Sequence, residues 1–348
     1  MDDKAKTLYI VIGCDTDPDR QGFIDIIPGN KLSWRGMTEG IPDTKLAVMD
    51  IKDSGGKSPV FTWLMRADDQ INIIYGAYNW VLENYKGLIE DLEKTGDEIG
   101  WHPHFYKHND KHGIWYQELK DVSWQCRMLE SAHKSFGEIF PGKPRSVRTG
   151  WLYHNNETMK KLDELGLKID FSAVPGLRTN PVKKIKFHYN IYDWFSTGKE
   201  CYHPSEADYR RAAREGEREL SILEVPNFTS HSWFWGMVSG FYMAGKMKDP
   251  VQIIQAIRKP TFWVSLSAGR KWFSPIIKSL AKELRRPTES DIFFITYFHP
   301  DELIENRSKI YNRDNLKRNL KSIINLSDRL EIPHRYIRAE DIPLLISE

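Results

Sequence analysis

Two aspartates near the start of the sequence have the types and spacing for chemistry. Asp15 and Asp17 follow the apolar run LYIVIGC. Residues two apart in an extended chain point to the same side, so both carboxylates can face one site. Two carboxylates held together repel each other unless a cation or a shared proton relieves them. The alternative interpretation is an ordinary strand-to-loop turn, in which Asp and Pro are common.

A histidine cluster follows at 102–112, where four of the eleven histidines lie. His102 and His104 would share a face if the chain stays extended, whereas His104 and His108 would share one if it turns helical. An aspartate with two imidazoles can bind a first-row divalent metal and leave positions open for water and substrate. Surface histidines in a polar loop are the alternative.

Further polar and aromatic residues follow later strands. Arg148 can hold a carboxylate in its ionised form, or make a purely structural ion pair. His299 is suited to donating a proton near neutral pH. Trp151 and Tyr153 can stack on a sugar ring, and packing at the rim of the sheet is the equal alternative. The sequence holds no GxSxG, Walker, GxGxxG or HExxH motif, so it gives no support to those enzyme classes.

Alternating strands and helices must position these groups. We expect buried strands over 8–14, 60–66, 98–101, 146–148, 167–172, 222–226 and within 291–303. We expect helices over 73–92, 121–139, 155–165, 208–221 and 314–329, the fourth of them charged and largely exposed. This order predicts a parallel sheet covered by helices, either closed as a barrel or open and doubly wound. In a closed barrel the carboxyl ends of the strands share one rim.

Composition limits the partners and the compartment. The 348 residues carry 50 Lys and Arg against 48 Asp and Glu, a formal charge of +2, which disfavours nucleic acid as a partner. The cysteines are three and scattered, forming neither a disulfide framework nor a metal knuckle, and the start lacks a signal-peptide pattern. We therefore expect a cytoplasmic protein. The aromatic segment 231–247 is too short to cross a bilayer. It is either a buried helix or an interfacial patch that makes a peripheral contact with a membrane.

Four strand-end motifs, in this order, resemble the polysaccharide deacetylase superfamily, which has the NodB-homology fold of carbohydrate esterase family 4. The motifs are CDTDPD, DEIGWHPHFY, VRTGW and TYFHPDEL. DEIGWHP together with RTGW is similar to the branch that serves envelope-polysaccharide and O-antigen biosynthesis. The resemblance implies an α/β fold, an incomplete or distorted (β/α) barrel, and metal-dependent removal of an N-acetyl group from a carbohydrate.

The resemblance also implies roles for individual residues. Asp17 and His102 would bind the metal, Asp15 would be the general base and Arg148 would orient it. His299 would be the general acid that protonates the leaving amine. The metal would be zinc, with manganese, nickel or cobalt as alternatives.

The sequence departs from the family pattern at two places. The paired acids, usually adjacent, are separated by Thr16, so the roles of base and ligand are open to exchange. Tyr106 stands where the family has its second histidine, so we predict His104 as the second imidazole ligand, with His108 as the alternative.

The motifs span nearly the whole chain, which predicts one barrel domain over 1–348 with an insertion at 178–290 that shapes the substrate cleft. The substrate would be a polysaccharide or a sugar intermediate carried on a lipid or nucleotide. Two other functions remain open: a metal-free hydrolase of another C–N bond, and a catalytically inactive protein that binds glycans or acts as a scaffold.

Overall fold

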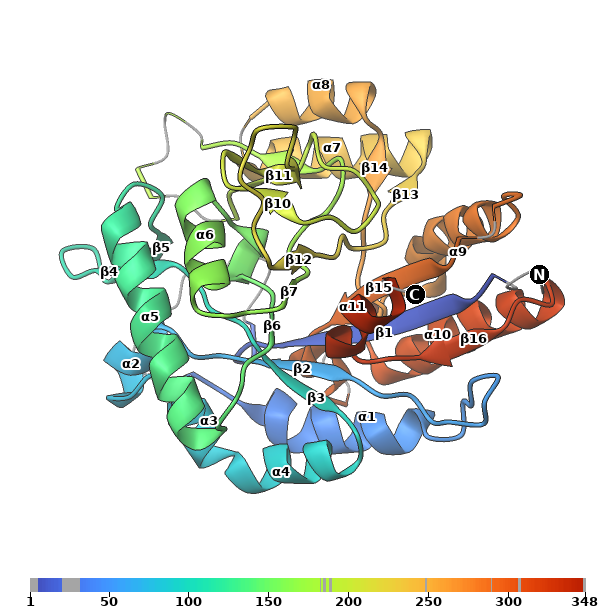
Figure 1. Ribbon diagram of the computed structural model, residues 1–348, viewed down its shortest axis with the longest axis horizontal. Helices are drawn as coiled ribbons and strands as arrows, with labels where there is room; N and C mark the ends of the chain where they lie inside the picture. The colour runs from blue at the N-terminus through green and yellow to red at the C-terminus, as the bar shows by residue number, and fades with distance from the viewer. Residues whose placement is uncertain are drawn as a thin grey trace. The chain divides into compact units, whose positions relative to one another are not determined.

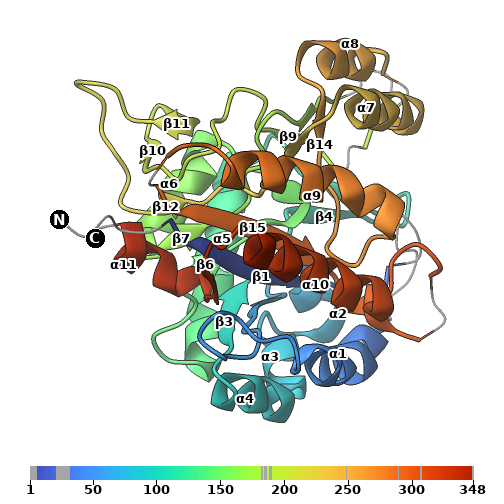
Figure 2. The same ribbon diagram turned by 90° about the vertical axis from the view of Figure 1, so that its right-hand side faces the viewer.

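The computed structural model describes most of the chain, and Figures 1 and 2 show its ribbon from two sides. The described residues are 6–20, 32–181, 183, 186–187, 190–247, 249–288, 290–305 and 308–346. The chain divides into two compact units. Unit 1 comprises 1–14, 34–62 and 227–345, and unit 2 comprises 15–33, 63–226 and 346–348. Strands β1 (Leu8–Thr16) and β2 (Thr62–Met65) each contribute residues to both units.

The sheet of unit 2 has the spatial strand order β12, β7, β6, β3, β2, and the pairs from β12 to β3 are parallel. Besides β2, these strands are β3 (Glu98–Trp101), β6 (Ser146–Val147), β7 (Ile169–Asp170) and β12 (Leu223–Glu224). The helices are α2 (Asp69–Tyr75), α3 (Trp80–Asn84), α4 (Lys86–Lys94), α5 (Val122–Ile139) and α6 (Asn156–Glu164). Three two-stranded ribbons complete the unit: β4 (Tyr106–Asn109) with β5 (Ile114–Gln117), β8 (Arg178–Thr179) with β9 (Tyr192–Asp193), and β10 (Pro204–Ser205) with β11 (Asp208–Ala212).

In unit 1, β1 pairs in parallel with β15 (Ile292–Phe298) on one side and with β16 (His334–Tyr336) on the other. A short antiparallel pair joins β13 (Ser230–His231) to β14 (Thr261–Phe262). The helices are α1 (Ile41–Val48), α7 (Trp233–Met247), α8 (Val251–Arg258), α9 (Arg270–Leu284), α10 (Arg313–Arg329) and α11 (Ile342–Ile346), whose last residue belongs to unit 2. Helix α9 packs against α10, and α7 packs against α8.

The strands β1 and β2 are buried because most of their residues are apolar. In β1 every residue except Tyr9 is buried, and all four residues of β2 and of β3 are buried. Parallel strands covered on both faces take such continuous apolar runs. Polar residues begin where the strands end, at Arg66 after β2, His102 after β3 and Arg148 after β6. The α/β class predicted from the sequence is confirmed.

Two predicted helices differ from the structure. The helix expected over 73–92 is three short helices, because Gly76 takes the left-handed conformation (φ 86°) at the end of α2. The charged helix expected over 208–221 is wrong, since this segment holds strand β11 and a loop. Its charges pair across the loop, where Arg211 contacts Glu217, and the chain reverses near Gly216 (φ 82°).

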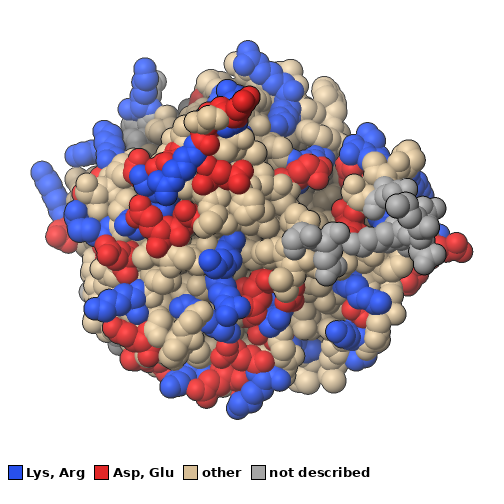
Figure 3. All heavy atoms as spheres, in the orientation of Figure 1, with Lys and Arg blue, Asp and Glu red and all other residues tan. Residues whose placement is uncertain are grey.

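The aromatic segment 231–247 contains a helix, α7, but that helix is not buried. Trp233, Phe234 and Phe241 are among the most exposed large apolar side chains of the described chain. Within the described ranges, no helix combines the length and apolar character needed to span a membrane. Figure 3 shows basic and acidic side chains interspersed over one face of the molecule.

Candidate active site

The carboxyl end of β1 and the segment after β3 bring Asp17, His102 and His104 together in unit 2. His104 Nε2 lies 3.1 Å from Asp17 Oδ1, and His102 Nε2 lies 3.6 Å from Asp17 Oδ2. The two Nε2 atoms are 3.1 Å apart. Donors bound tetrahedrally at zinc–ligand distances lie about 3.3 Å from one another, so the three atoms fit a small divalent cation. The structure thus brings together the three residues predicted as ligands, and their binding of a metal stays a prediction.

Hydrogen bonding directs the imidazole of His102 toward this set. Its Nδ1 lies 2.6 Å from the carbonyl oxygen of Arg148. A carbonyl only accepts, so Nδ1 carries the proton, and in the neutral ring the lone pair of Nε2 faces Asp17 and His104. A backbone carbonyl that fixes the tautomer in this way is the usual support of a metal-binding histidine.

Burial and neighbouring charges set the ionisation of the three side chains. Burial opposes ionisation of Asp17, but its interactions with His104 and His102 outweigh that effect and hold its pKa well below the ordinary value. Burial, together with the charge of Arg66, lowers the pKa of His104 to about 4. Burial also acts to lower the pKa of His102, but Asp15 and Asp17 outweigh it and raise that pKa. His104 is therefore neutral near neutral pH, with a lone pair available to a metal.

Arg66 is a member of the site that the sequence analysis missed. Its buried guanidinium donates from Nη1 to Asp17 Oδ1 at 2.7 Å and from Nε to Asp68 Oδ2 at 2.7 Å. The same Asp68 oxygen accepts the backbone N–H of His104 at 3.1 Å. Arg66 and Asp68 thus position two members of the ligand set. The only signal in the sequence is a basic residue at a strand end, directly before the polar cluster ADDQ.

Asp15 and Arg148 form a buried ion pair beside this set. Arg148 Nη1 lies 2.9 Å from Asp15 Oδ1, and the Arg148 side chain is inaccessible to solvent. Its Nε donates to the carbonyl oxygen of Phe171 at 3.0 Å, and its guanidinium lies 4.4 Å from the centre of the Phe171 ring. These contacts leave the arginine little freedom. Arg148 is therefore in a position to orient the carboxylate of Asp15.

Gly150, in the RTGW motif, is packed against His104. A Cβ atom at this position would lie 2.1 Å from Cγ of His104, far inside van der Waals contact. On another side, the ring of Tyr106 stacks on His104 with centroids 4.9 Å apart. Tyr106 in turn accepts a hydrogen bond from Trp151 Nε1. The imidazole of His104 is therefore confined by a glycine and an aromatic ring.

The two predicted sugar-stacking residues lie in different surroundings. Trp151 is partly exposed and takes a left-handed backbone conformation (φ 55°), which is strained for a bulky side chain and recurs at functional sites. Tyr153 is buried, with its ring against Phe105 and its hydroxyl near Gln125 and Asn155. Trp151 is the better placed of the two for a substrate, because the ring of Tyr153 is already covered.

Behind Arg148 lies a second buried cluster that the sequence analysis did not identify. His154 Nε2 is 2.8 Å from Asp170 Oδ2, and Glu224 lies opposite Asp170 on the neighbouring strand. Burial, reinforced by the charge of Asp170, raises the pKa of Glu224 well above its ordinary value. Burial opposes ionisation of Asp170, but His154 outweighs it and lowers that pKa. The cluster therefore holds one carboxylate and one carboxylic acid side by side.

Two other predicted histidines lie outside the ligand set. His108, the alternative second ligand, is partly exposed, and its Nδ1 lies 2.7 Å from Asp110. His299, the predicted acid, follows β15 in unit 1, where its Nδ1 lies 3.4 Å from Glu302 Oε1. Its role in the reaction stays a prediction.

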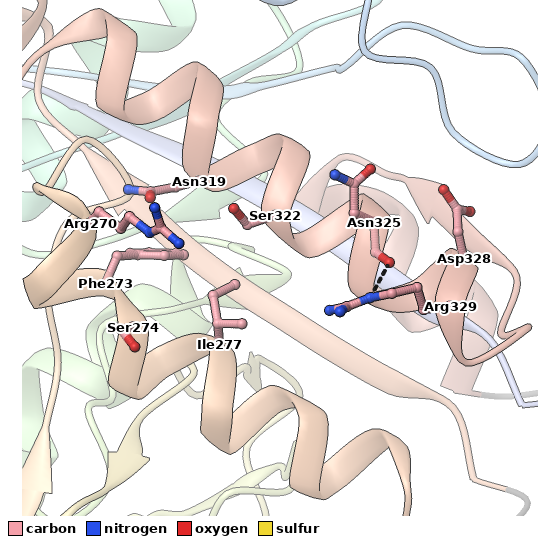
Figure 4. A pocket seen from close by; sticks show the side chains of 9 residues that line it. All are labelled: Arg270, Phe273, Ser274, Ile277, Asn319, Ser322, Asn325, Asp328 and Arg329. Atoms are coloured by element: carbon pink, nitrogen blue, oxygen red, sulfur yellow. Dashed lines mark hydrogen bonds between the residues drawn. The ribbon is translucent and has the colours of Figure 1, made fainter.

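A cavity of about 580 Å³ in unit 1 lies between α9 and α10 and contains none of the predicted site residues (Figure 4). Most of its lining side chains are polar, and Arg270 and Arg329 lie toward opposite sides of the view. The lining residues are Arg270, Phe273, Ser274, Ile277, Asn319, Ser322, Asn325, Asp328 and Arg329.

Several solved structures resemble this chain. A protein described as a glycoside hydrolase/deacetylase from Parabacteroides distasonis aligns with 99% of this chain and 72% of its own, at a TM-score of 0.52 and 9% identity. A polysaccharide deacetylase from Mycobacterium smegmatis aligns with 100% of this chain and 92% of its own, at a TM-score of 0.48 and 13% identity. A polysaccharide deacetylase involved in O-antigen biosynthesis, from Bordetella bronchiseptica, aligns with 91% of this chain and 83% of its own, at a TM-score of 0.35 and 15% identity.

No protein-family model matches the sequence, and no curated protein matches it. The first structural similarity, which extends over nearly the whole chain, confirms the architecture that the strand-end motifs predicted. The chain therefore shares the incomplete (β/α)-barrel fold of that structure.

Proposed function

We propose that this protein is a divalent-metal-dependent hydrolase that removes an N-acetyl group from a carbohydrate. The observation that carries the proposal is the meeting of Asp17, His102 and His104 beside the buried pair of Asp15 and Arg148. One carboxylate is thus available to bind a cation while a second, separately held, is available to accept a proton. The deacetylases among the similar structures support the same reaction class.

The residues divide the proton transfers of amide hydrolysis between them. Asp17, His102 and His104 would hold the cation, which when bound polarises the amide carbonyl and makes water more acidic. Asp15, oriented by Arg148, would take a proton from the attacking water as the C–O bond forms. His299 gives a proton to the nitrogen as the C–N bond breaks, because an unprotonated amide nitrogen is a poor leaving group. The products are acetate and a free amino sugar.

The finer assignments belong to the same proposal. Zinc suits a ligand set of two imidazoles and one carboxylate, and manganese, nickel and cobalt are the alternatives. The substrate would be a polysaccharide or a lipid- or nucleotide-linked sugar of surface-polysaccharide assembly, with Trp151 stacking on one ring. The reaction would take place in the cytoplasm.

A second candidate, hydrolysis without a metal, is favoured by Arg66. Its guanidinium already provides a fixed positive charge 2.7 Å from Asp17 Oδ1, the same oxygen that faces His104. If this charge replaces the cation, protein stripped by a chelator keeps its full rate of acetate release. Loss of activity on chelation, with recovery when zinc is returned, favours the metal-dependent mechanism instead.

Acetate release from soluble N-acetylated oligosaccharides tests the proposed reaction directly. We expect Asp15→Asn to lower kcat by about 10²-fold or more, because asparagine cannot accept the proton. Asp110→Asn is the matched control, since Asp110 is fully exposed and lies outside the site. Equal rates for wild type and Asp15→Asn would contradict the assignment of Asp15 as base.

A further inference from the structure

Helices α7 and α8 of unit 1 present an apolar face to solvent. On α7, the exposed fractions of Trp233, Phe234 and Phe241 are 69%, 61% and 58%. On α8, Ile254 and Ile257 are 50% and 57% exposed. Figure 2 shows the two helices side by side. Large exposed apolar side chains gathered on two neighbouring helices are typical of a surface that binds something.

The face of α7 that packs against α8 carries glycines, while Trp233, Phe234 and Phe241 remain largely exposed. A Cβ atom on Gly240 would lie 2.4 Å from Cβ of Ala256, and one on Gly236 would lie 2.6 Å from the backbone of Pro260. The glycines therefore allow α8 and the segment after it to approach α7 closely. The glycines thus bring the two helices together, Trp235 packs on Phe262 and Trp272, and the other aromatic side chains of α7 are exposed.

Helix α9 extends this face with a further tryptophan. The ring centroids of Trp235 and Trp272 lie 4.9 Å apart, and Trp272 is 37% exposed. Arg270 and Lys271, directly before Trp272, are exposed. Arg258, at the end of α8, is exposed as well, two residues before the Pro260 that contacts Gly236. Basic residues thus neighbour the aromatic ones along the chain in this region, and Arg270 also lines the cavity between α9 and α10.

The charge of this region differs from that of the rest of the chain. Residues 231–272 hold six basic residues and one acidic residue, a formal charge of +5 in a chain whose total is +2. The basic residues are Lys246, Lys248, Arg258, Lys259, Arg270 and Lys271, and the acid is Asp249. A second copy of this chain would bring two such positive surfaces together, which opposes self-association. The charge instead matches an anionic surface.

We propose that the outward face of α7 and α8, with Trp272, binds the surface of an anionic phospholipid bilayer. Tryptophan and phenylalanine enter the boundary between headgroups and acyl chains, where an amphipathic ring finds both apolar and polar surroundings. The flanking arginines and lysines are attracted to the negative headgroups. The contact is peripheral, and it does not depend on the proposed deacetylase reaction.

Flotation of the full-length protein with vesicles tests this inference. We expect wild type to float with vesicles of phosphatidylcholine and phosphatidylglycerol, and to bind vesicles of phosphatidylcholine alone more weakly. The double variant Trp233→Ala/Phe234→Ala is expected to lower the partition coefficient about tenfold. Arg258→Glu/Arg270→Glu is expected to lower it for anionic vesicles only. Leu46→Ala is the matched control, because Leu46 is 69% exposed on α1, outside this face.

Three results would overturn the proposal. Wild type would fail to float with anionic vesicles, or the aromatic double variant would float as well as wild type. Alternatively, light scattering would show a dimer that the aromatic substitutions dissociate, with no vesicle binding, which would identify self-association as the use of this face. Acetate release from soluble oligosaccharides is expected to stay unchanged in these variants, so loss of lipid binding is distinguishable from loss of catalysis.

Discussion

At the scale of single residues, the ligand set depends on neighbours that orient it. The carbonyl of Arg148 fixes the ring of His102, and Asp68 holds the backbone of His104. In other metal sites, substitution of such supporting groups typically lowers metal affinity by about 10- to 100-fold. Of the two candidates for the second imidazole ligand, His104 lies beside Asp17 and His108 lies beside Asp110, and the choice of His104 stays a prediction.

The substitution Gly150→Ala tests how tightly His104 is confined. The added methyl group would meet the imidazole, so the ring must move away from Asp17. We expect zinc affinity, measured by competition with a chelating dye, to fall about tenfold or more. Gly87→Ala is the control, because nothing lies within 4 Å of its Cβ position on α4. Unchanged affinity in Gly150→Ala would show that His104 is not a ligand.

Several site residues could not be found from the sequence because their roles arise from tertiary pairing. Arg66 follows the apolar run VFTWLM, His154 follows WLY, and Glu224 lies within ILEVP. Each residue type is common in structural ion pairs. Nothing in the local sequence identifies the partner, because Asp17 lies 49 positions from Arg66, and Asp170 lies 16 positions from His154 and 54 from Glu224. The positions of polar residues at strand ends predicted that they gather at one rim of the sheet. Which of them contact each other could be seen only in the folded structure.

At the scale of elements, the strands were the most predictable part. Runs such as LYIVIGC are apolar without a break, which only a strand or helix buried on all sides accommodates. The predictions of helices failed where the local sequence pattern is compatible with two different structures. Alternating charges over 208–221 suit an exposed helix, yet in the structure they pair along β11 and across the loop that follows it. The apolar periodicity over 73–92 runs through Gly76, but this glycine takes a left-handed conformation and ends α2.

The pairing of β7 with β12 predicts how stability depends on pH. Asp170 and Glu224 are direct partners on these strands, and the pKa of Glu224 is raised above its ordinary value of 4.5. A raised pKa means that the folded state holds the proton more tightly than the unfolded state. Its contribution to stability is therefore full below about pH 4.5 and is lost as the pH rises through the folded pKa.

The substitution Glu224→Gln removes this proton uptake while keeping a neutral side chain of similar shape. We expect the variant to lose less thermal stability than wild type between pH 5 and pH 8, as measured by calorimetry at both values. Glu215→Gln, on the exposed loop after β11, is the control and is expected to follow wild type. If Glu224→Gln and wild type lose stability in parallel, then Glu224 is ionised in the folded protein.

At the scale of the whole molecule, the charges balance overall but are unevenly distributed. The total is +2, yet 231–272 alone carries +5. On the face shown in Figure 3, acidic and basic side chains alternate without a broad region of one sign. Such a surface gives little attraction to a phosphate backbone.

We therefore expect no stable complex with duplex DNA or RNA at physiological salt, measured by fluorescence anisotropy of labelled 20-mers. Any weak binding at low salt is expected to disappear with Arg258→Glu/Arg270→Glu, since those residues lie in the basic region. Salt-resistant binding in the micromolar range or tighter would contradict this expectation.

The metal content of the full-length protein, purified without chelators, tests the central claim most directly. We expect about one equivalent of zinc or another first-row divalent metal per chain in wild type and in the control His108→Ala, measured by mass spectrometry of the metal. We expect little or none in Asp17→Ala and His102→Ala, with folding of each verified by circular dichroism. Wild type without stoichiometric metal, or ligand variants that retain as much metal as wild type, would contradict the account.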